Sequence, residues 1–202
     1  MSAVVGQNRS LMELKTDALV VVDLEASCWL GPPPPGEQNE IIEVGVCLLS
    51  LETGAISARQ SLLVKPTRSK ISEFCTELTT LTQSQVDAGM PFDTACDVLR
   101  TEYDTPNRLW ASWGNYDKNM FISQCASFGI DYPFGPKHFN LKKIYAKVYN
   151  SRPPGMTGAL EQLNIPLTGT HHRGGDDAYN IALITAAMLS VRGNSIFGVK
   201  PA

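Results

Sequence analysis

The sequence of 202 residues contains no apolar run that approaches the roughly 20 residues a membrane-spanning helix needs. Residues 1–16 lack a basic region followed by an apolar stretch, so we expect no secretory signal. Charged residues make up only 18% of the chain, its net charge is −3 and 43% of its residues are hydrophobic, which excludes an intrinsically disordered protein. These features predict a soluble protein with one buried core and no membrane partner.

The cysteines are few and widely spaced. There are five, an odd number, and none forms a Cys-x-x-Cys pair, which argues against a zinc ribbon and against a disulfide framework. We expect free thiols that are mostly buried in the core. This use of cysteine predicts an intracellular, reducing compartment, the cytoplasm before others.

The hydrophobic pattern predicts an α/β fold in a single domain. Short stretches rich in β-branched residues predict strands at residues 18–26, 41–51, 55–64 and 109–113. Helical spacing and helix-ending glycines predict helices at residues 82–100 (interrupted at 89–91), 120–128, 141–149, shortly after 157, and 177–191. The prolines at 32–35 predict an exposed, stiff loop, with a surface connection of no binding role as the plain alternative. We place the domain at residues 17–193, between tails at 1–16 and 194–202.

Two carboxylates stand inside the first apolar strand. Asp23 and Glu25 are two residues apart, so their side chains point to the same face. Burying two like charges side by side is costly unless a cation neutralises them or one takes up a proton. A solvated strand edge is the alternative. A shared divalent metal is the better account, and oxygen ligands favour Mg²⁺ or Mn²⁺.

Further acidic residues and two histidines follow later in the chain. Asp117 comes just after a predicted strand, where an Asp is also a common helix N-cap. Asp177 opens the last predicted helix after a Gly-Gly pair that we expect to be a flexible turn, and Asp176 is the better N-cap candidate. His172, five residues before Asp177, is placed to act over a metal that Asp177 holds, since two-metal sites combine acidic ligands with a base.

Taken together, these pieces resemble the DEDDh (DnaQ-like) 3′→5′ exonucleases. The signature consists of Asp-x-Glu on the first strand, a middle Asp and a terminal His-x-x-x-x-Asp. The branch of histone-mRNA and small-RNA exonucleases is indicated by VDLEASC (22–28), EIIEV (40–44), SEFCTELTTLT (72–82) and RGGDDAYNIA (173–182). The resemblance covers about residues 18–190, in the family's order and spacing.

The resemblance implies an RNase H-like mixed β-sheet flanked by helices. It implies that Asp23, Glu25, Asp117 and Asp177 hold two Mg²⁺ or Mn²⁺ ions, and that His172 is the general base that deprotonates the attacking water. His171 is the runner-up base, but its spacing to Asp177 is one residue too long for the motif. The implied reaction releases nucleoside 5′-monophosphates from single-stranded 3′ ends, of RNA rather than DNA.

The resemblance also implies contacts with the substrate's last nucleotide by Leu24, Ala26, Leu81 and Tyr116. For Leu81, ordinary core packing is the alternative. The sequence departs from the family's pattern twice: Thr80 stands where glycine is frequent, and Tyr116 stands where tryptophan often precedes the middle Asp. A tyrosine is still able to stack on a base or to hydrogen-bond.

A basic stretch suggests where a longer strand of nucleic acid would lie. Residues 132–160 contain no acid, and we expect Lys142, Lys143 and Lys147 to follow the phosphate backbone, with a solvated helix face as the alternative. No additional nucleic-acid-binding module is present in the sequence, so we expect a partner protein to provide targeting.

Two other functions remain open at the level of sequence. One is a nuclease of the same fold that acts on very short oligonucleotides or trims DNA. The other is a catalytically silent domain that binds RNA ends or a protein, against which the presence of all four acids and the histidine argues.

Overall fold

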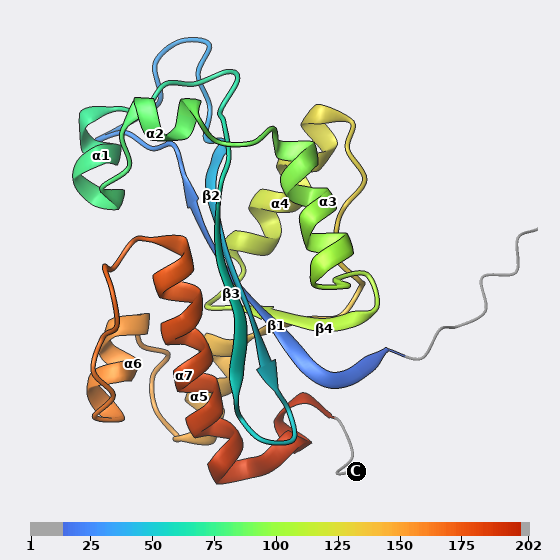
Figure 1. Cartoon of the computed structure of the whole chain (residues 1–202). Coiled ribbons are helices and arrows are strands. Elements are labelled where there is room, and N and C mark those ends of the chain that lie inside the picture. The colour runs from blue at the N-terminus through green and yellow to red at the C-terminus, as the bar shows by residue number, and fades with distance from the viewer. Residues whose placement is uncertain (1–13, 199–202) are drawn as a thin grey trace, which may run out of the picture.

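The computed structural model of the protein describes residues 14–198, and a five-stranded mixed sheet forms its centre (Figure 1). The strand order is β3-β2-β1-β4-β5, with β1 antiparallel to β2 and parallel to β4. The strands are β1 (Lys15–Ala26), β2 (Ile41–Ser50), β3 (Ile56–Leu63), β4 (Arg108–Ser112) and β5 (His138–Asn140). The predicted mixed sheet in a single α/β domain is confirmed.

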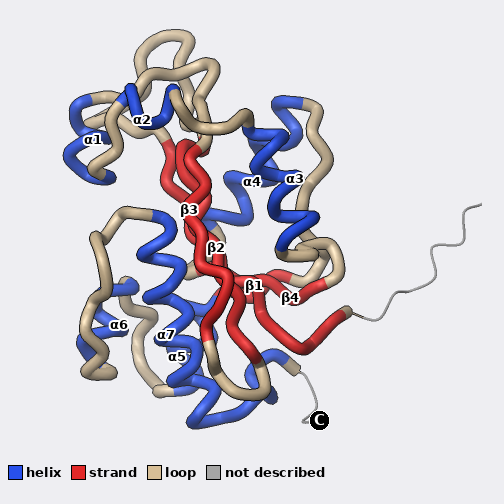
Figure 2. The backbone as a smooth tube through the Cα atoms, in the orientation of Figure 1, coloured by secondary structure: helices blue, strands red, loops and turns tan. Residues whose placement is uncertain are grey.

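Helices cover both faces of the sheet. They are α1 (Glu73–Thr79), α2 (Gln83–Asp87), α3 (Phe92–Glu102), α4 (Tyr116–Phe128), α5 (Leu141–Val148), α6 (Met156–Gln162) and α7 (Gly174–Arg192), followed by the 3-10 turn η1 (Gly193–Phe197). Helices α3 and α4 lie on one side of the strands and α5, α6 and α7 on the other, as Figure 2 shows. No helix among residues 14–198 is long and apolar enough to span a membrane.

The alternation of side chains along β1 separates two cores. Leu19 and Val21 pack into the core beneath α5, α6 and α7, whereas Val20 and Val22 pack into the core beneath α3 and α4. Because successive side chains of a strand point to opposite faces, Asp23 lies on the α7 side, in line with Leu19 and Val21. The strand that builds the core therefore also aims a carboxylate at the beginning of α7.

Several boundaries differ from the predicted ones. Strand β1 begins at Lys15, within the predicted N-terminal tail, most of which lies outside the described residues. The predicted C-terminal tail from residue 194 is wrong over residues 194–197, because Phe197 is buried and packs against Phe139, their ring centroids 4.9 Å apart. Helix α1 and the three-residue strand β5 were not predicted. Four of the five cysteines are buried free thiols, and Cys28 is partly buried.

The glycine pair before Asp177 is not a flexible turn. Gly174 and Gly175 are buried and form the first residues of α7. A Cβ on Gly175 would lie 2.9 Å from the Ser61 Cβ, so the missing side chain is what lets the helix begin against β3. The glycines thus bring α7 onto the sheet, and the prediction of a flexible turn is wrong.

Thr80 shows why glycine is frequent at its position. It ends α1 in the left-handed conformation, with φ 63° and ψ 2°. Glycine adopts this conformation without the steric cost that a β-branched side chain incurs. Thr80 therefore preserves the helix-ending geometry with a less suitable residue.

Candidate active site

Three carboxylates from two elements meet at the end of β1. Asp23 and Glu25 come from β1, and Asp177 comes from the first turn of α7. One oxygen of each lies within 4.8 Å of the others. Residues more than 150 positions apart in the sequence thus form one group of oxygen donors, the kind that binds hard divalent cations.

Asp117 reaches the same region from the other side of the sheet. It is the second residue of α4, and its Oδ1 accepts a hydrogen bond of 3.0 Å from the Leu24 backbone N–H. The pairing of β1 with β4 ends at Val21 opposite Ala111. The Leu24 N–H lies beyond this last pair, and Asp117 accepts its hydrogen bond in place of a strand. The N-cap of α4 is Asn115, so the alternative role of Asp117 as a helix cap is wrong.

The two histidines contact Asp177 in different ways. The Asp177 Oδ2 is 2.8 Å from Nδ1 of the His171 ring and accepts a 3.0 Å hydrogen bond from the His172 backbone N–H. The two imidazoles stack with their centroids 3.9 Å apart, and the His172 backbone is left-handed, with φ 64°. Among the described residues, none forms a hydrogen bond with the His172 ring. The structure thus gives the His171 ring a bond to Asp177 and leaves the His172 ring without a hydrogen bond to any described residue.

Asp176, the other aspartate of this segment, is not an N-cap. It is the third residue of α7, whose N-cap is Arg173. Its carboxylate accepts a 2.7 Å hydrogen bond from the Thr170 N–H and pairs with Arg59 on β3. The prediction that Asp176 caps the helix is wrong, and its role is to tie the preceding loop and the neighbouring strand to α7.

Desolvation raises the pKa of all four acids, and repulsion between the acids raises it further at Asp23 and Glu25. The pKa of Asp23 lies well above its ordinary value because of desolvation and then the Asp117 charge. Desolvation and the Asp177 charge raise the pKa of Glu25 to about 8. Burial also raises the pKa of Asp117 and of Asp177. Such a cluster is unfavourable in its ionised state unless cations neutralise it.

One oxygen of the cluster fits a metal in particular. Oδ1 of Asp177 is buried, yet among the described residues it has no hydrogen-bond partner. A buried acceptor without a partner is costly, and a cation supplies what such an oxygen lacks. The donor set and this oxygen together fit a divalent ion.

A cavity of about 350 Å³ opens onto the acids. Besides the four acids and both histidines, it is lined by Leu24, Ala26, Cys28, Leu78, Trp113, Tyr116 and Met156. Tyr116 lines this cavity and is 57% exposed, as a stacking platform requires. The structure thus brings three of the four predicted nucleotide contacts, Leu24, Ala26 and Tyr116, to the cavity.

Leu81 does not belong to this cavity. It is fully buried and packs with Ile42, Cys75 and Val86 in a separate apolar cluster, so its predicted contact with a nucleotide is wrong. Leu78, three residues earlier and within α1, lines the cavity in its place. Without α1 in the prediction, the sequence did not show which leucine of this segment is buried.

None of the three predicted phosphate-contacting lysines lines the cavity at the acids. Lys142 and Lys143 lie in the first turn of α5, whose N-cap Asn140 donates a 3.0 Å hydrogen bond to Asn115, the neighbour of Tyr116. Lys147 instead lines another cavity with Arg192. The rise per residue of an α-helix separates Arg192 from Asp177 by roughly 20 Å along α7. Lys147 thus lies away from the acids, where only a longer strand of nucleic acid could reach it, and its contact with the phosphate backbone stays a prediction.

Comparison with known proteins gives consistent results. The model of the RNase_T family, described as exonuclease, matches residues 20–185. The chain is 31% identical over 203 residues to the 3′-5′ exonuclease Snipper of Drosophila melanogaster, covering 90% of this chain and 72% of that protein. It is 34% identical to 3′-5′ exoribonuclease 1 of Homo sapiens, covering 86% of this chain and 52% of that protein.

Solved structures agree with these relatives. The nuclease domain of 3′hExo, a DEDDh family member bound to rAMP, superposes with a TM-score of 0.79 at 30% identity, covering 88% of this chain and 94% of that one. A 3′-exonuclease described with the histone mRNA stem-loop gives a TM-score of 0.77 at 30% identity, covering 87% and 82%. The first of these structures has a nucleoside monophosphate bound, and the second concerns recognition of an RNA 3′ end.

Proposed function

Because this chain belongs to the DEDDh family of 3′→5′ exonucleases, in its histone-mRNA and small-RNA exonuclease branch, we propose that it removes nucleotides from single-stranded RNA 3′ ends. The observation that carries this proposal is the convergence of Asp23, Glu25 and Asp177 within 4.8 Å at the floor of an open cavity. Enzymes of this family generally use divalent metals, and the raised pKa values of these acids are what such a site produces without them.

Two Mg²⁺ or Mn²⁺ ions are the cofactors that we propose, held by Asp23, Glu25, Asp117 and Asp177. When bound, such ions lower the pKa of water and stabilise the charge on the oxygens of an in-line phosphoryl displacement. The cluster supplies the negative charge that two dications require, and the partnerless Asp177 Oδ1 is one of the donors.

The chain's own residues complete the proposed reaction. The His172 imidazole accepts the proton of the attacking water at a ring nitrogen, since that ring lines the cavity and desolvation lowers its pKa, which keeps it neutral. His171 orients Asp177 through its Nδ1. Leu24 and Ala26 pack against the terminal nucleoside, and Tyr116 stacks on its base. The product of each step is a nucleoside 5′-monophosphate.

The preference for RNA and the need for a targeting partner rest on the relatives. The chain spans 37% of the ERI1 exoribonuclease 2 of Danio rerio and 52% of the human 3′-5′ exoribonuclease 1, so the substrates of those whole proteins are proposals for this chain. We propose single-stranded RNA 3′ ends as the substrate, delivered by a partner protein. The five free thiols support a reducing intracellular compartment as its location.

Digestion of a 5′-labelled single-stranded RNA and of its DNA counterpart tests the proposal. We expect a ladder that shortens from the 3′ end with Mg²⁺ or Mn²⁺ and is abolished by EDTA and by Asp177→Ala. Faster digestion of RNA supports the RNA assignment, and faster digestion of DNA overturns it. A folded protein that gives no products with either metal overturns the proposal in favour of a silent RNA-end-binding domain.

A further inference from the structure

A fifth carboxylate lies directly behind the acidic cluster. Glu43 on β2 is paired with Glu25 of β1 in the antiparallel register, and its side chain is fully buried. Paired residues of neighbouring strands point to the same face, so Glu43 is directed toward α7 like Glu25. A buried acid next to four others is unfavourable unless it is itself neutralised.

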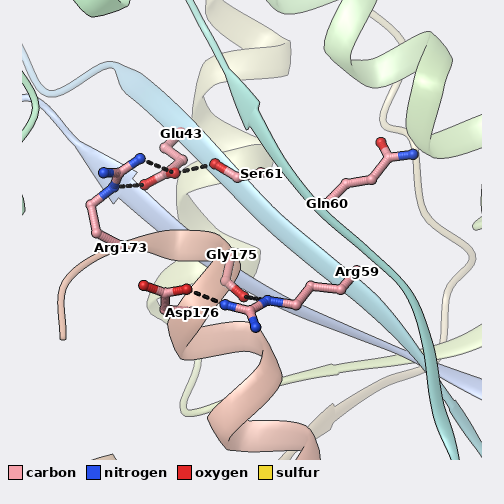
Figure 3. Close-up of a pocket in the computed structure, with 7 residues that line it drawn as sticks. All are labelled: Glu43, Arg59, Gln60, Ser61, Arg173, Gly175 and Asp176. Carbon is pink, nitrogen blue, oxygen red and sulfur yellow. Dashed lines mark hydrogen bonds and ion pairs between the residues drawn. The ribbon is translucent and has the colours of Figure 1, made fainter. Parts of the chain in front are cut away.

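Both oxygens of Glu43 are used within the protein. Oε2 accepts hydrogen bonds of 3.2 Å from Nε of Arg173 and 2.8 Å from the backbone N–H of Gly174. Oε1 accepts a 3.1 Å hydrogen bond from Arg173 and another from the Ser61 hydroxyl. Figure 3 shows the Arg173 guanidinium lying against the carboxylate of Glu43. With this two-point pairing, Glu43 has partners at both oxygens and differs in this from the metal-ligand candidates.

The pair acts at the very start of α7. Arg173 is the N-cap of the helix, and its side chain makes no capping bond to the helix. The first N–H groups of a helix lack partners within it. One of them, the Gly174 N–H, donates its hydrogen bond to the carboxylate of Glu43 on β2. Asp177 lies one turn further, where its N–H donates a 2.8 Å hydrogen bond to the Arg173 carbonyl.

A second strand holds the other side of the same turn. Arg59 on β3 donates a 3.0 Å hydrogen bond from Nε to the Gly175 carbonyl and pairs with Asp176. Its guanidinium lies 4.7 Å from the centre of the Tyr179 ring. These contacts border a second cavity of about 380 Å³, which is lined by both arginines and by neither His171 nor His172. Hydrogen bonds and ion pairs thus join the first turn of α7 to both β2 and β3.

We propose that Glu43 and Arg173 are positioning residues of the exonuclease, which hold the first turn of α7 so that Asp177 and the histidines keep their places opposite Asp23 and Glu25. The inference rests on the proposed metal-dependent function. The acids repel one another, so the cluster alone does not hold α7 against β1. The ion pair behind it opposes this repulsion without occupying a ligand oxygen. Neither residue touches the substrate in this scheme.

Arg173→Gln is the principal test, with Arg100→Gln as its matched control. The side chains of Arg173 and Arg100 are 28% and 25% exposed, and each forms an ion pair, but Arg100 lies on α3, on the other side of the sheet. We expect Arg173→Gln to lower both the calorimetric affinity for Mn²⁺ and the kcat by about 10- to 100-fold, the usual effect of losing a group that orients metal ligands. Arg100→Gln should change both the Mn²⁺ affinity and the kcat by less than about twofold, even if the two variants lower the melting temperature equally.

Rescue and coupling separate positioning from mere stabilisation. Arg173→Lys should restore part of the Mn²⁺ affinity, because an ammonium keeps the charge but lacks the planar two-point geometry. The double variant Glu43→Gln/Arg173→Gln should lose no more affinity than the worse single variant, as expected of residues that act as a unit. In the imidazole NMR spectrum, whose three histidine signals are easily followed, Arg173→Gln should shift His171 and His172 and leave His138 unchanged.

The results decide between this inference and the function it rests on. If EDTA abolishes the activity of the wild type, and Arg173→Gln has the same Mn²⁺ affinity and kcat as Arg100→Gln, the positioning role alone is overturned. Additive losses in the double variant, or unshifted signals of His171 and His172, also overturn it. A wild type that neither binds Mn²⁺ nor digests RNA overturns the proposed function itself.

Discussion

Gly45 of β2 and Gly174 of α7 face each other at the point where the helix meets the sheet, and a Cβ built on Gly45 would lie 1.8 Å from the Gly174 carbonyl oxygen. Gly45 is paired with Asp23 in the register of β1 and β2. Because Asp177 lies in the first turn of α7, the close approach of the helix to Gly45 also brings Asp177 close to Asp23. Any side chain at residue 45 has to push the start of the helix away.

Gly45→Ala should accordingly damage both stability and metal binding. The added methyl group meets backbone atoms rather than a flexible side chain, so we expect a loss of roughly 3 kcal/mol in the free energy of unfolding and a large fall in Mn²⁺ affinity. Gly158→Ala in α6 is the control, since its Cβ would meet only the Pro154 side chain at 3.6 Å. Urea unfolding and calorimetry measure the two effects. Equal stability of the two variants would contradict the close-approach argument.

Asp23→Ala should abolish exonuclease activity while the protein stays folded. Asp23 carries a carboxylate that desolvation and its acidic neighbours make unfavourable, so its removal relieves repulsion in the metal-free protein. We expect a melting temperature without metal at least equal to that of the wild type, and a turnover lowered by about a thousandfold or more. Retained turnover on 5′-labelled RNA would show that Asp23 does not hold a catalytic ion. An unfolded variant would show that the carboxylate serves the fold.

His172→Ala and His171→Ala should separate turnover from metal affinity. His172 lines the cavity and bonds Asp177 only through its backbone, so the loss of its ring should lower kcat by about 100-fold or more and leave Mn²⁺ affinity nearly unchanged. The ring of His171 contacts Asp177, so its loss should weaken Mn²⁺ binding as well. Single-turnover digestion and calorimetry on both variants measure the difference. The reverse pattern would assign the general base to His171.

The sequence predicted the acids because strand periodicity is a local property. Asp23 and Glu25 are placed on one face by the geometry of a single strand, and the motif spacing added Asp117, Asp177 and His172, all of which line the cavity. What brings Asp177 to Asp23 is not local, because it depends on glycines in different elements that lie side by side only after folding. For the same reason the Gly-Gly pair was taken for a flexible turn.

Other errors in the prediction also arise from tertiary packing. Leu78 lies in α1 and Leu81 lies just beyond its left-handed end, and only the packing of this segment decides that the first lines the cavity and the second is buried. Glu43 was recognised only as part of a motif, because its partner Arg173 lies 130 residues away. An ion pair between distant residues leaves no periodic signal in a single sequence.

The metal-free protein should become less stable as the pH rises from about 6.5 to about 8. In the folded protein the pKa of Glu25 is about 8, above its ordinary value of 4.5, so between these values the folded state holds a proton that the unfolded chain has lost. The contribution of Glu25 to stability is complete below its pKa in the unfolded chain, and it is lost as the pH rises through its pKa in the folded protein. The pKa values of Asp23, Asp117 and Asp177 are raised too, and their contributions have the same sign.

Thermal unfolding in EDTA and in Mn²⁺ at several pH values measures this effect. The lowered pKa of His172 acts in the opposite direction, but mainly below its ordinary value of 6.5, so the window from about 6.5 to 8 reports the acids. We expect a loss of roughly 2 kcal/mol across it in EDTA, or several degrees in Tm, and a smaller loss in Glu25→Gln. Mn²⁺ should raise Tm more at pH 8 than at pH 6.5, because at higher pH it displaces fewer protons from the cluster. A metal-free Tm that is constant or rises over this window would contradict the buried, mutually repelling cluster.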